Sequence, residues 1–223
     1  MFCYALIFAK REERMTGPDK TREFAQWNER FSGADYWFGT EPNAFLARQA
    51  GRLKPGWKAL AIADGEGRNG VWLARHGLEV TSVDLVPNGV AKAKRLAARL
   101  GVALEAICAD LETWDWGPPR FDLVVGIFFQ FAAPRFRETL FRRMTEVLNP
   151  GGLLLIEGYR PEQLAYGTGG PPQIENLYTA ELLRAAFADM EILELDEYDA
   201  EIREGSRHHG MSALIDLVAK KPG

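Results

Sequence analysis

Cysteine is scarce in this chain, and its N-terminal apolar run is short. The 223 residues include two cysteines, Cys3 and Cys108, with no Cys-x-x-Cys pair and no metal-ligand spacing. This excludes a disulfide scaffold and a cysteine metal site, and it is typical of a protein of the reducing cytoplasm. The apolar run at residues 2–9 is too short to span a bilayer, and its charges follow it, the reverse of a secretory signal.

An excess of basic charge is also missing. The chain has 27 Lys and Arg against 31 Asp and Glu, a formal charge of −4. Duplex DNA and anionic membranes both require a net basic footprint, so we expect neither as a partner. Hydrophobic residues make up 47% and charged residues 26%, as in an ordinary soluble globular protein of one domain with a small appendage. The expected partner is a small-molecule substrate, and the expected state a monomer or homodimer.

Alternating strand-like and helical segments predict an α/β fold. Apolar runs stand at residues 59–63, 79–83, 103–106, 121–126 and 153–157, with helical patterns between them at 69–76, 87–100, 134–148 and 179–188. Two more strand-like runs, 192–198 and 212–219, flank a charged segment, 200–211, that predicts a hairpin loop. We therefore expect a doubly wound, mostly parallel seven-stranded sheet with a C-terminal antiparallel hairpin and helices on both faces, a Rossmann-like arrangement.

Three segments follow from this pattern. Residues 1–20 are expected to be an unstructured tail, and Met15 is a candidate internal start site. Residues 21–56 predict a helical lid, with an amphipathic helix at 21–31 and a second helix at about 42–52. Residues 57–223 are expected to form the cofactor-binding domain.

A glycine-rich turn carries the strongest functional signal. Gly65, Gly67 and Gly70 satisfy G-x-G-x-x-G directly after a strand and before a helix. Asp84 ends the next strand, 19 residues after Gly65, where a carboxylate can accept hydrogen bonds from ribose hydroxyls. A second acid, Asp110, follows the third strand and can accept from an adenine amino group. The combination predicts a cofactor that carries a nucleoside.

These motifs together resemble the class I S-adenosylmethionine-dependent methyltransferases over residues 57–221. The similarity includes the glycine turn, the two acids, the Leu-x-Pro-Gly-Gly turn at 148–152 and the closing hairpin. Residues 65–84, GEGRNGVWLARHGLEVTSVD, are similar to the small tellurite-resistance-type methyltransferases. The resemblance implies S-adenosyl-L-methionine as cofactor, with contacts from Trp37, Asp64, Gly65, Gly67, Asn69, Asp84, Leu85, Asp110, Leu111, Gly126 and Ile127.

The turn departs from that family in one respect. Ala61 and Ala63 stand where the family usually has an acid and the first glycine, and Asp64 is the nearest candidate substitute. Two alternatives therefore stay open beside a methyltransferase. One is a nicotinamide-dependent oxidoreductase, although no Tyr-x-x-x-Lys pair or separate substrate domain is evident. The other is a methyltransferase-like module that binds without turnover.

The sequence signals for substrate-binding and catalytic residues are less specific than those for the cofactor. Phe128 follows the fourth strand and predicts an aromatic wall of the substrate pocket. Tyr159 and Arg160 follow the fifth strand and are candidate substrate contacts. Glu157 is an alternative partner for Arg160. The loop 167–172 resembles a flexible lid. His209 is the preferred candidate for a catalytic general base over its neighbour in the hairpin, His208. The basic run Lys92, Lys94, Arg95 and Arg99 is expected to be a solvated helix face. The candidate methyl acceptors are thiols, chalcogen oxyanions and oxygen nucleophiles.

Overall fold

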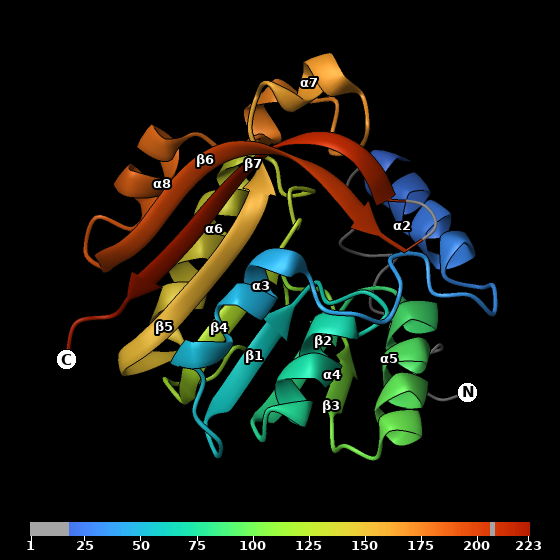
Figure 1. Ribbon diagram of the computed structural model, residues 1–223, viewed down its shortest axis with the longest axis horizontal. Helices are drawn as coiled ribbons and strands as arrows, with labels where there is room; N and C mark the ends of the chain where they lie inside the picture. Colours follow the sequence, from blue (N-terminus) through green and yellow to red (C-terminus); the bar gives the residue numbers. More distant parts are fainter. Residues whose placement is uncertain (1–17, 206–207) are drawn as a thin grey trace.

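A seven-stranded sheet forms the centre of the computed structural model, which describes residues 18–205 and 208–223 (Figure 1). The strand order is β3-β2-β1-β4-β5-β7-β6. Strands β1 to β5 pair in parallel, whereas β7 runs antiparallel between β5 and β6. The predicted doubly wound sheet with a closing hairpin is confirmed. The strands are β1 (Lys58–Ile62), β2 (Glu79–Asp84), β3 (Glu105–Cys108), β4 (Phe121–Ile127), β5 (Leu148–Tyr159), β6 (Glu191–Glu204) and β7 (His208–Lys220).

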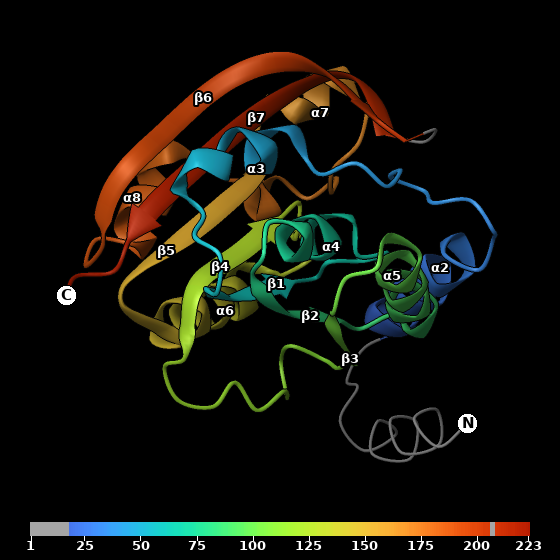
Figure 2. The same ribbon diagram turned by 60° about the horizontal axis from the view of Figure 1, so that its bottom comes forward.

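Helices cover both faces of the sheet because neighbouring strand residues point to opposite sides. Leu60 of β1 packs in the cluster that contains α6 and α8, whereas its neighbour Ala59 packs in the cluster that contains α3 and α4. Figure 2 shows α3, α4 and α5 on one side and α6 on the other. The helices are α2 (Pro18–Arg30), α3 (Ala44–Arg48), η1 (Ala50–Arg52), α4 (Arg68–Arg75), α5 (Pro87–Leu100), α6 (Pro134–Glu146), α7 (Gln163–Tyr166), η2 (Ile174–Asn176) and α8 (Ala180–Ala186).

The C-terminal hairpin is longer than the sequence predicts. Most of the segment 200–211, expected to be a loop, continues β6 to Glu204 and starts β7 at His208. The hairpin arches over the carboxyl edge of the parallel strands toward α2 (Figure 1). At its tip, a Cβ on Gly205 would lie 2.5 Å from the Gly39 nitrogen and the Trp37 carbonyl oxygen. The tip therefore packs directly against the segment that joins α2 to α3.

The N-terminal helix also starts earlier than expected. Helix α2 begins at Pro18, so residues 18–20 belong to the helix and not to the predicted tail. The rest of that tail, including Met15, lies outside the described residues. Within the described part of the chain, no helix is long and apolar enough to cross a membrane.

Close packing between α4 and α5 generates a prediction about Gly67. This residue caps α4 at φ +88°, and a Cβ there would lie 2.4 Å from the Cβ of Ala93 in α5. Gly67→Ala should lower the free energy of unfolding by about 2–4 kcal/mol, since backbone strain adds to overpacking. Gly101→Ala is the matched control. Its φ is +69°, but no atom lies within 4 Å of its Cβ position, so only the strain of about 1 kcal/mol applies. Equal losses in urea unfolding would contradict this packing account.

Candidate active site

The turn between β1 and α4 lies at the carboxyl edge of the sheet. Gly65 and Gly67 adopt φ values of +56° and +88°, and Ala63 adopts +48°. Asp84, at the end of β2, reaches this turn: its Oδ2 accepts the Gly65 N–H at 2.8 Å, and its Oδ1 accepts the Val86 N–H at 2.8 Å. Sequence spacing thus brings the glycines and the acid together as predicted. Each carboxylate oxygen keeps a lone pair for a ligand hydroxyl.

Asp64 holds the turn from inside. Both of its carboxylate oxygens lie 3.2 Å from the Gly70 nitrogen, and Oδ2 accepts the Ser82 hydroxyl at 2.8 Å. Burial raises the pKa of Asp64 to about 7, although the bonds from Ser82 and Gly70 act in the opposite direction. Ala61, where the family usually has an acid, is buried within β1. Asp64 therefore supplies acceptors to the turn that Ala61 cannot supply.

A buried ion pair fastens the N-terminal segment to this turn. The Lys92 ammonium lies 2.6 Å from Glu66, and both side chains are at most 2% exposed. Glu66 also accepts the Trp37 N–H at 2.7 Å, and Lys92 donates to the carbonyl of Asp35. The expectation that Lys92 lies on a solvated helix face is wrong, because its ammonium is buried and paired with Glu66 and the Asp35 carbonyl. The segment 35–37 is thereby held against the glycine turn and α5.

Phe31 covers the glycine turn from the end of α2. A Cβ on Gly65 would lie 3.5 Å from the Phe31 ring, and one on Gly89 of α5 would lie 3.1 Å from it. The Phe31 ring is buried. The side chain amide of Asn88 donates to the carbonyl of Asn28 at 2.8 Å, which ties α2 to the start of α5. In this structure the end of α2 therefore covers the glycine turn beside Asp84.

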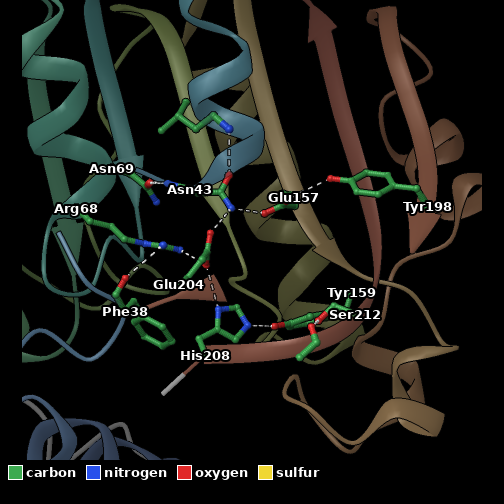
Figure 3. Close-up of polar contacts among 12 residues, drawn as sticks. Phe38, Asn43, Arg68, Asn69, Glu157, Tyr159, Tyr198, Glu204, His208 and Ser212 are labelled. Carbon is green, nitrogen blue, oxygen red and sulfur yellow. Dashed lines mark hydrogen bonds and ion pairs between the residues drawn. The ribbon is translucent and has the colours of Figure 1, made fainter. Parts of the chain in front are cut away.

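A second polar network lies where the hairpin crosses the carboxyl edge (Figure 3). Arg68, the first residue of α4, pairs with Glu204 of β6 at 2.7 Å. Glu204 also lies 3.0 Å from Nδ1 of His208, and Nε2 of that imidazole contacts the hydroxyl of Tyr159 at the end of β5. Arg68, Glu204 and His208 each have side chains about 10% exposed. Four elements therefore meet in one buried chain of polar contacts.

Electrostatics set the protonation of this network. Burial alone would raise the pKa of Glu204, but the hydrogen bond from His208 and the Arg68 charge outweigh it and lower the pKa to about 2. Burial raises the pKa of Tyr159, and the charges of Glu204 and Glu157 raise it further. Glu204 is therefore a carboxylate and Tyr159 a neutral phenol.

Asn43 links this network to a second acid, Glu157. Its side chain amide donates to Glu157 at 2.5 Å and to Glu204 at 3.1 Å, while its backbone N–H donates to Asn69 at 2.9 Å. Burial raises the pKa of Glu157, as do the nearby charges of Asp216 and Glu204. Asn43 thus connects the lid, the glycine-turn helix and the sheet.

Comparison with known proteins agrees with this architecture. Residues 59–152 match the family model described as a methyltransferase domain. The structure of TehB from Haemophilus influenzae superposes with a TM-score of 0.68 at 21% identity, covering 80% of this chain and 62% of that one. The N-methyltransferase NodS from Bradyrhizobium japonicum WM9, in complex with S-adenosyl-L-homocysteine, gives 0.70 at 15% identity, covering 90% and 98%. No curated protein sequence matches significantly.

Residues 59–152 thus match a methyltransferase domain, and the chain has the fold of the solved TehB and NodS structures. At these identities the solved structures show the fold, and the family model identifies the domain within residues 59–152. This chain spans only 62% of the TehB structure. The strand order also argues against the oxidoreductase alternative, because a doubly wound dinucleotide fold has the order 3-2-1-4-5-6, without an antiparallel strand between the last two.

The structure places the other expected cofactor residues around the carboxyl edge of the sheet. Asp110 follows β3, half-buried, and accepts the Glu112 N–H at 3.0 Å. Leu85 is half-buried after β2, whereas the side chain of Leu111 packs in the core. Asn69 is buried as the partner of Asn43, and Trp37 lies at the turn through Glu66. Gly126 and Ile127 end β4, where Ile127 packs in the core. Their contacts with a cofactor remain predictions.

The expected substrate residues separate in the structure. Phe128 stacks on Tyr159 with ring centroids 4.6 Å apart, and its φ of +52° is strained for a side chain of this size. Arg160 instead pairs with Asp199 at 2.5 Å and with Glu162 at 3.5 Å. Glu157, the alternative partner, instead accepts hydrogen bonds from Asn43 and Tyr198. The structure therefore brings Phe128 and Tyr159 together and directs Arg160 toward β6.

The two hairpin histidines lie on opposite faces of β7. His209, the expected base, is exposed and stands opposite Arg203 in the β6 ladder, whereas His208 is buried at the network. Only His208 therefore reaches the network, because one residue along a strand reverses the side chain. The catalytic role expected for His209 stays a prediction. Sequence reasoning also missed Asn43 and Glu204. In the extended hairpin, side chains at even positions point inward, among them Ile202, Glu204, His208 and Ser212. This alternation would have indicated Glu204 and His208 if the segment had been predicted as two strands.

The buried Asp64 generates a prediction about pH. A folded-state pKa near 7, against 3.8 in the unfolded chain, means that only the native state holds this proton between about pH 4 and 7. Stability should therefore fall as pH rises through this window, with a slope of up to about 1.4 kcal/mol per pH unit for one proton. Asp64→Asn should reduce the slope measured by urea unfolding. Glu146→Gln, on an exposed helix face, should not. An unchanged slope in Asp64→Asn would contradict the buried neutral acid.

Proposed function

We propose that the methyltransferase domain transfers the methyl group of S-adenosylmethionine to a small-molecule acceptor. The observation that carries the proposal is the position of Asp84 against the glycine turn. Its carboxylate lies at the carboxyl end of β2 and accepts the Gly65 N–H at 2.8 Å. In open parallel sheets, ligands bind in the crevice outside these strand ends.

The residues at this edge fit a nucleoside cofactor. Gly65 and Gly67 present a turn without side chains, and a carboxylate beside it can accept from both ribose hydroxyls. Asp110, after β3, is the proposed acceptor for an adenine amino group. When bound, the cofactor supplies an electrophilic methyl group on a sulfonium. The chain itself has to orient the acceptor and exclude water.

Two segments that lie over the carboxyl edge of the sheet favour a small acceptor. The segment 35–39 lies against the glycine turn through the Lys92–Glu66 pair, and the hairpin tip at Gly205 packs on Gly39. A macromolecular substrate would have to displace both. The formal charge of −4 likewise argues against nucleic acid.

Phe128 and Tyr159 are the proposed acceptor contacts. Phe128 follows β4 and Tyr159 ends the neighbouring strand β5, and the two rings stack on each other at the carboxyl edge. Arg160 is a weaker candidate, since an acidic acceptor would have to compete with Asp199 and Glu162 for its guanidinium. Thiols, chalcogen oxyanions and oxygen nucleophiles are the acceptor classes to be screened.

Removal of the Asp84 carboxylate tests the cofactor site. Asp84→Ala should weaken S-adenosylhomocysteine binding at least tenfold in calorimetry, because hydrogen bonds to a charged group contribute about 1.5–3 kcal/mol. Asp122→Ala is the matched control. Asp122 also accepts a backbone N–H, from Lys58 at 2.9 Å, but it lies at the start of β4 on the opposite edge. Unchanged affinity in a folded Asp84→Ala protein would contradict the assignment.

An acceptor screen tests the reaction itself. The full chain with S-adenosylmethionine is offered thiols, phenols, carboxylates and chalcogen oxyanions, and released S-adenosylhomocysteine is measured. Acceptor-dependent release supports methyl transfer. Cofactor binding without release above the uncatalysed rate for any of these classes would support the non-catalytic alternative.

A further inference from the structure

One continuous chain of polar contacts joins the cofactor turn to the acceptor surface. Arg68 directly follows Gly67, and its guanidinium pairs with Glu204 at 2.7 Å. Glu204 lies 3.0 Å from Nδ1 of His208, whose Nε2 contacts the Tyr159 hydroxyl (Figure 3). Tyr159 is also the residue that stacks on Phe128. No link of this chain is required by the cofactor-binding role of the turn.

The orientation of His208 follows from its two partners. A carboxylate accepts but cannot donate, so Glu204 fixes the imidazole with its proton on Nδ1. Nε2 is then left as an acceptor, and the only proton available to it in this contact is that of the Tyr159 hydroxyl. Arg68 in turn orients Glu204 and favours its ionised form. This is the arrangement of an oriented base, in which a carboxylate would stabilise the imidazolium when it forms.

Aromatic rings enclose the imidazole. Phe38 and Phe128 approach it edge to face, with ring centroids at 5.6 Å and 5.2 Å. Phe128 and Tyr159 are stacked at 4.6 Å. Phe128 holds a strained φ of +52° directly after β4, and such strain persists where the surrounding structure requires a side chain to point in one direction. Aromatic rings therefore surround the imidazole and stack on Tyr159, an environment that suits an acceptor that is itself aromatic.

We propose that Tyr159 and His208 form a proton relay that deprotonates an aromatic hydroxyl acceptor during methyl transfer. This inference rests on the proposed function and names its acceptor class, a phenol. Tyr159 is the catalytic residue that touches the acceptor, and His208 receives the proton through it. Glu204 and Arg68 are positioning residues.

The relay accounts for the proton that the acceptor loses during methyl transfer. The acceptor oxygen forms a bond to the methyl carbon while the carbon–sulfur bond breaks, and that electron pair stays on sulfur. The acceptor proton moves to the Tyr159 oxygen as the Tyr159 proton moves to Nε2 of His208. The resulting imidazolium stays paired with the Glu204 carboxylate and later releases its proton to water. The phenol becomes a methyl ether.

A phenol needs such a relay more than a thiol does. Unperturbed thiols lose their proton near pH 8.5 and phenols near pH 10, so a thiol supplies far more anion at neutral pH without help. The charged groups that face His208 are Glu204 directly, Arg68 through Glu204, and Glu157 through Asn43.

The loop after α7 covers Tyr159, whose side chain is buried. A Cβ on Gly169 would lie 3.3 Å from the Tyr159 hydroxyl oxygen, and one on Gly170 would lie 2.9 Å from its ring. The absence of side chains lets this loop lie flat on Tyr159. The acceptor therefore enters by displacing residues 167–170, the segment expected from the sequence to be a lid.

Kinetics of three variants test the relay. With para-substituted phenols and matched thiophenols as acceptors, His208→Gln and Tyr159→Phe should lower kcat on phenols about 100-fold at pH 7, as loss of a general base does. Loss on the thiophenols should be less than about fivefold. The phenol deficit should shrink as pH rises or as the phenol becomes more acidic. His209→Gln, one residue along the same strand but exposed, is the matched control and should behave as wild type.

A spectroscopic measurement needs no turnover. 4-Nitrophenol bound to the protein with S-adenosylhomocysteine should titrate to its yellow phenolate at lower pH in wild type and His209→Gln than in His208→Gln or Tyr159→Phe. Calorimetry with S-adenosylhomocysteine alone checks that every variant keeps its cofactor affinity and therefore its fold.

The outcomes separate the two proposals. Equal losses on phenols and thiophenols, a loss in His209→Gln instead of His208→Gln, or no binding of 4-nitrophenol by wild type would overturn the relay. Transfer to thiols alone would also overturn it while leaving the proposed function intact. Failure to bind S-adenosylhomocysteine would reject the proposed function itself, and the relay with it.

Discussion

The ion pair between Arg68 and Glu204 is the contact on which the rest of the site depends. It joins the first turn of α4 to the tip of the hairpin, two segments 136 residues apart in the chain. Burying two charges is costly unless further hydrogen bonds satisfy them. Glu204 meets this condition through His208 and Asn43. The pair thus fixes where the long hairpin ends, and with it the imidazole and the lid segment at Asn43.

The second buried pair, Lys92 with Glu66, has a separate role. It holds residues 35–37 against the glycine turn, whereas Phe31 covers that turn from α2. Under the proposed function, ligand entry on the Asp84 side requires movement of the N-terminal segment, and entry on the Tyr159 side requires movement of residues 167–170. Two separate covering segments suit the proposed reaction, which joins two different small molecules and has to exclude water.

The sequence predicts the half of the site that depends on local spacing. Gly65, Gly67 and Asp84 are separated by one strand, one helix and one turn, so a motif describes them fully. The acid that supports the turn is also local, since Asp64 reaches Gly70 six residues away. The strands and helices follow from apolar periodicity, with boundaries that differ by a few residues except in β5 and the hairpin.

The other half depends on contacts far apart in the sequence, which no local pattern contains. Asn43 and Glu157 are 114 residues apart, and Tyr159 and His208 are 49 apart. The choice between His208 and His209 required the register of β7, and a charged segment between two strands conceals that register. Lys92 shows the same limit: a lysine among surface lysines and arginines is buried because Glu66 of another element meets it there.

A crystal structure of the protein with S-adenosylhomocysteine and 4-nitrophenol tests the central claim most directly. The account predicts the ribose hydroxyls on the Asp84 carboxylate, the Phe31 ring displaced from Gly65, and the nitrophenol oxygen within hydrogen-bond distance of the Tyr159 hydroxyl, with Arg68, Glu204 and His208 still in contact. A cofactor bound away from Asp84, or a nitrophenol oxygen remote from Tyr159, would contradict it.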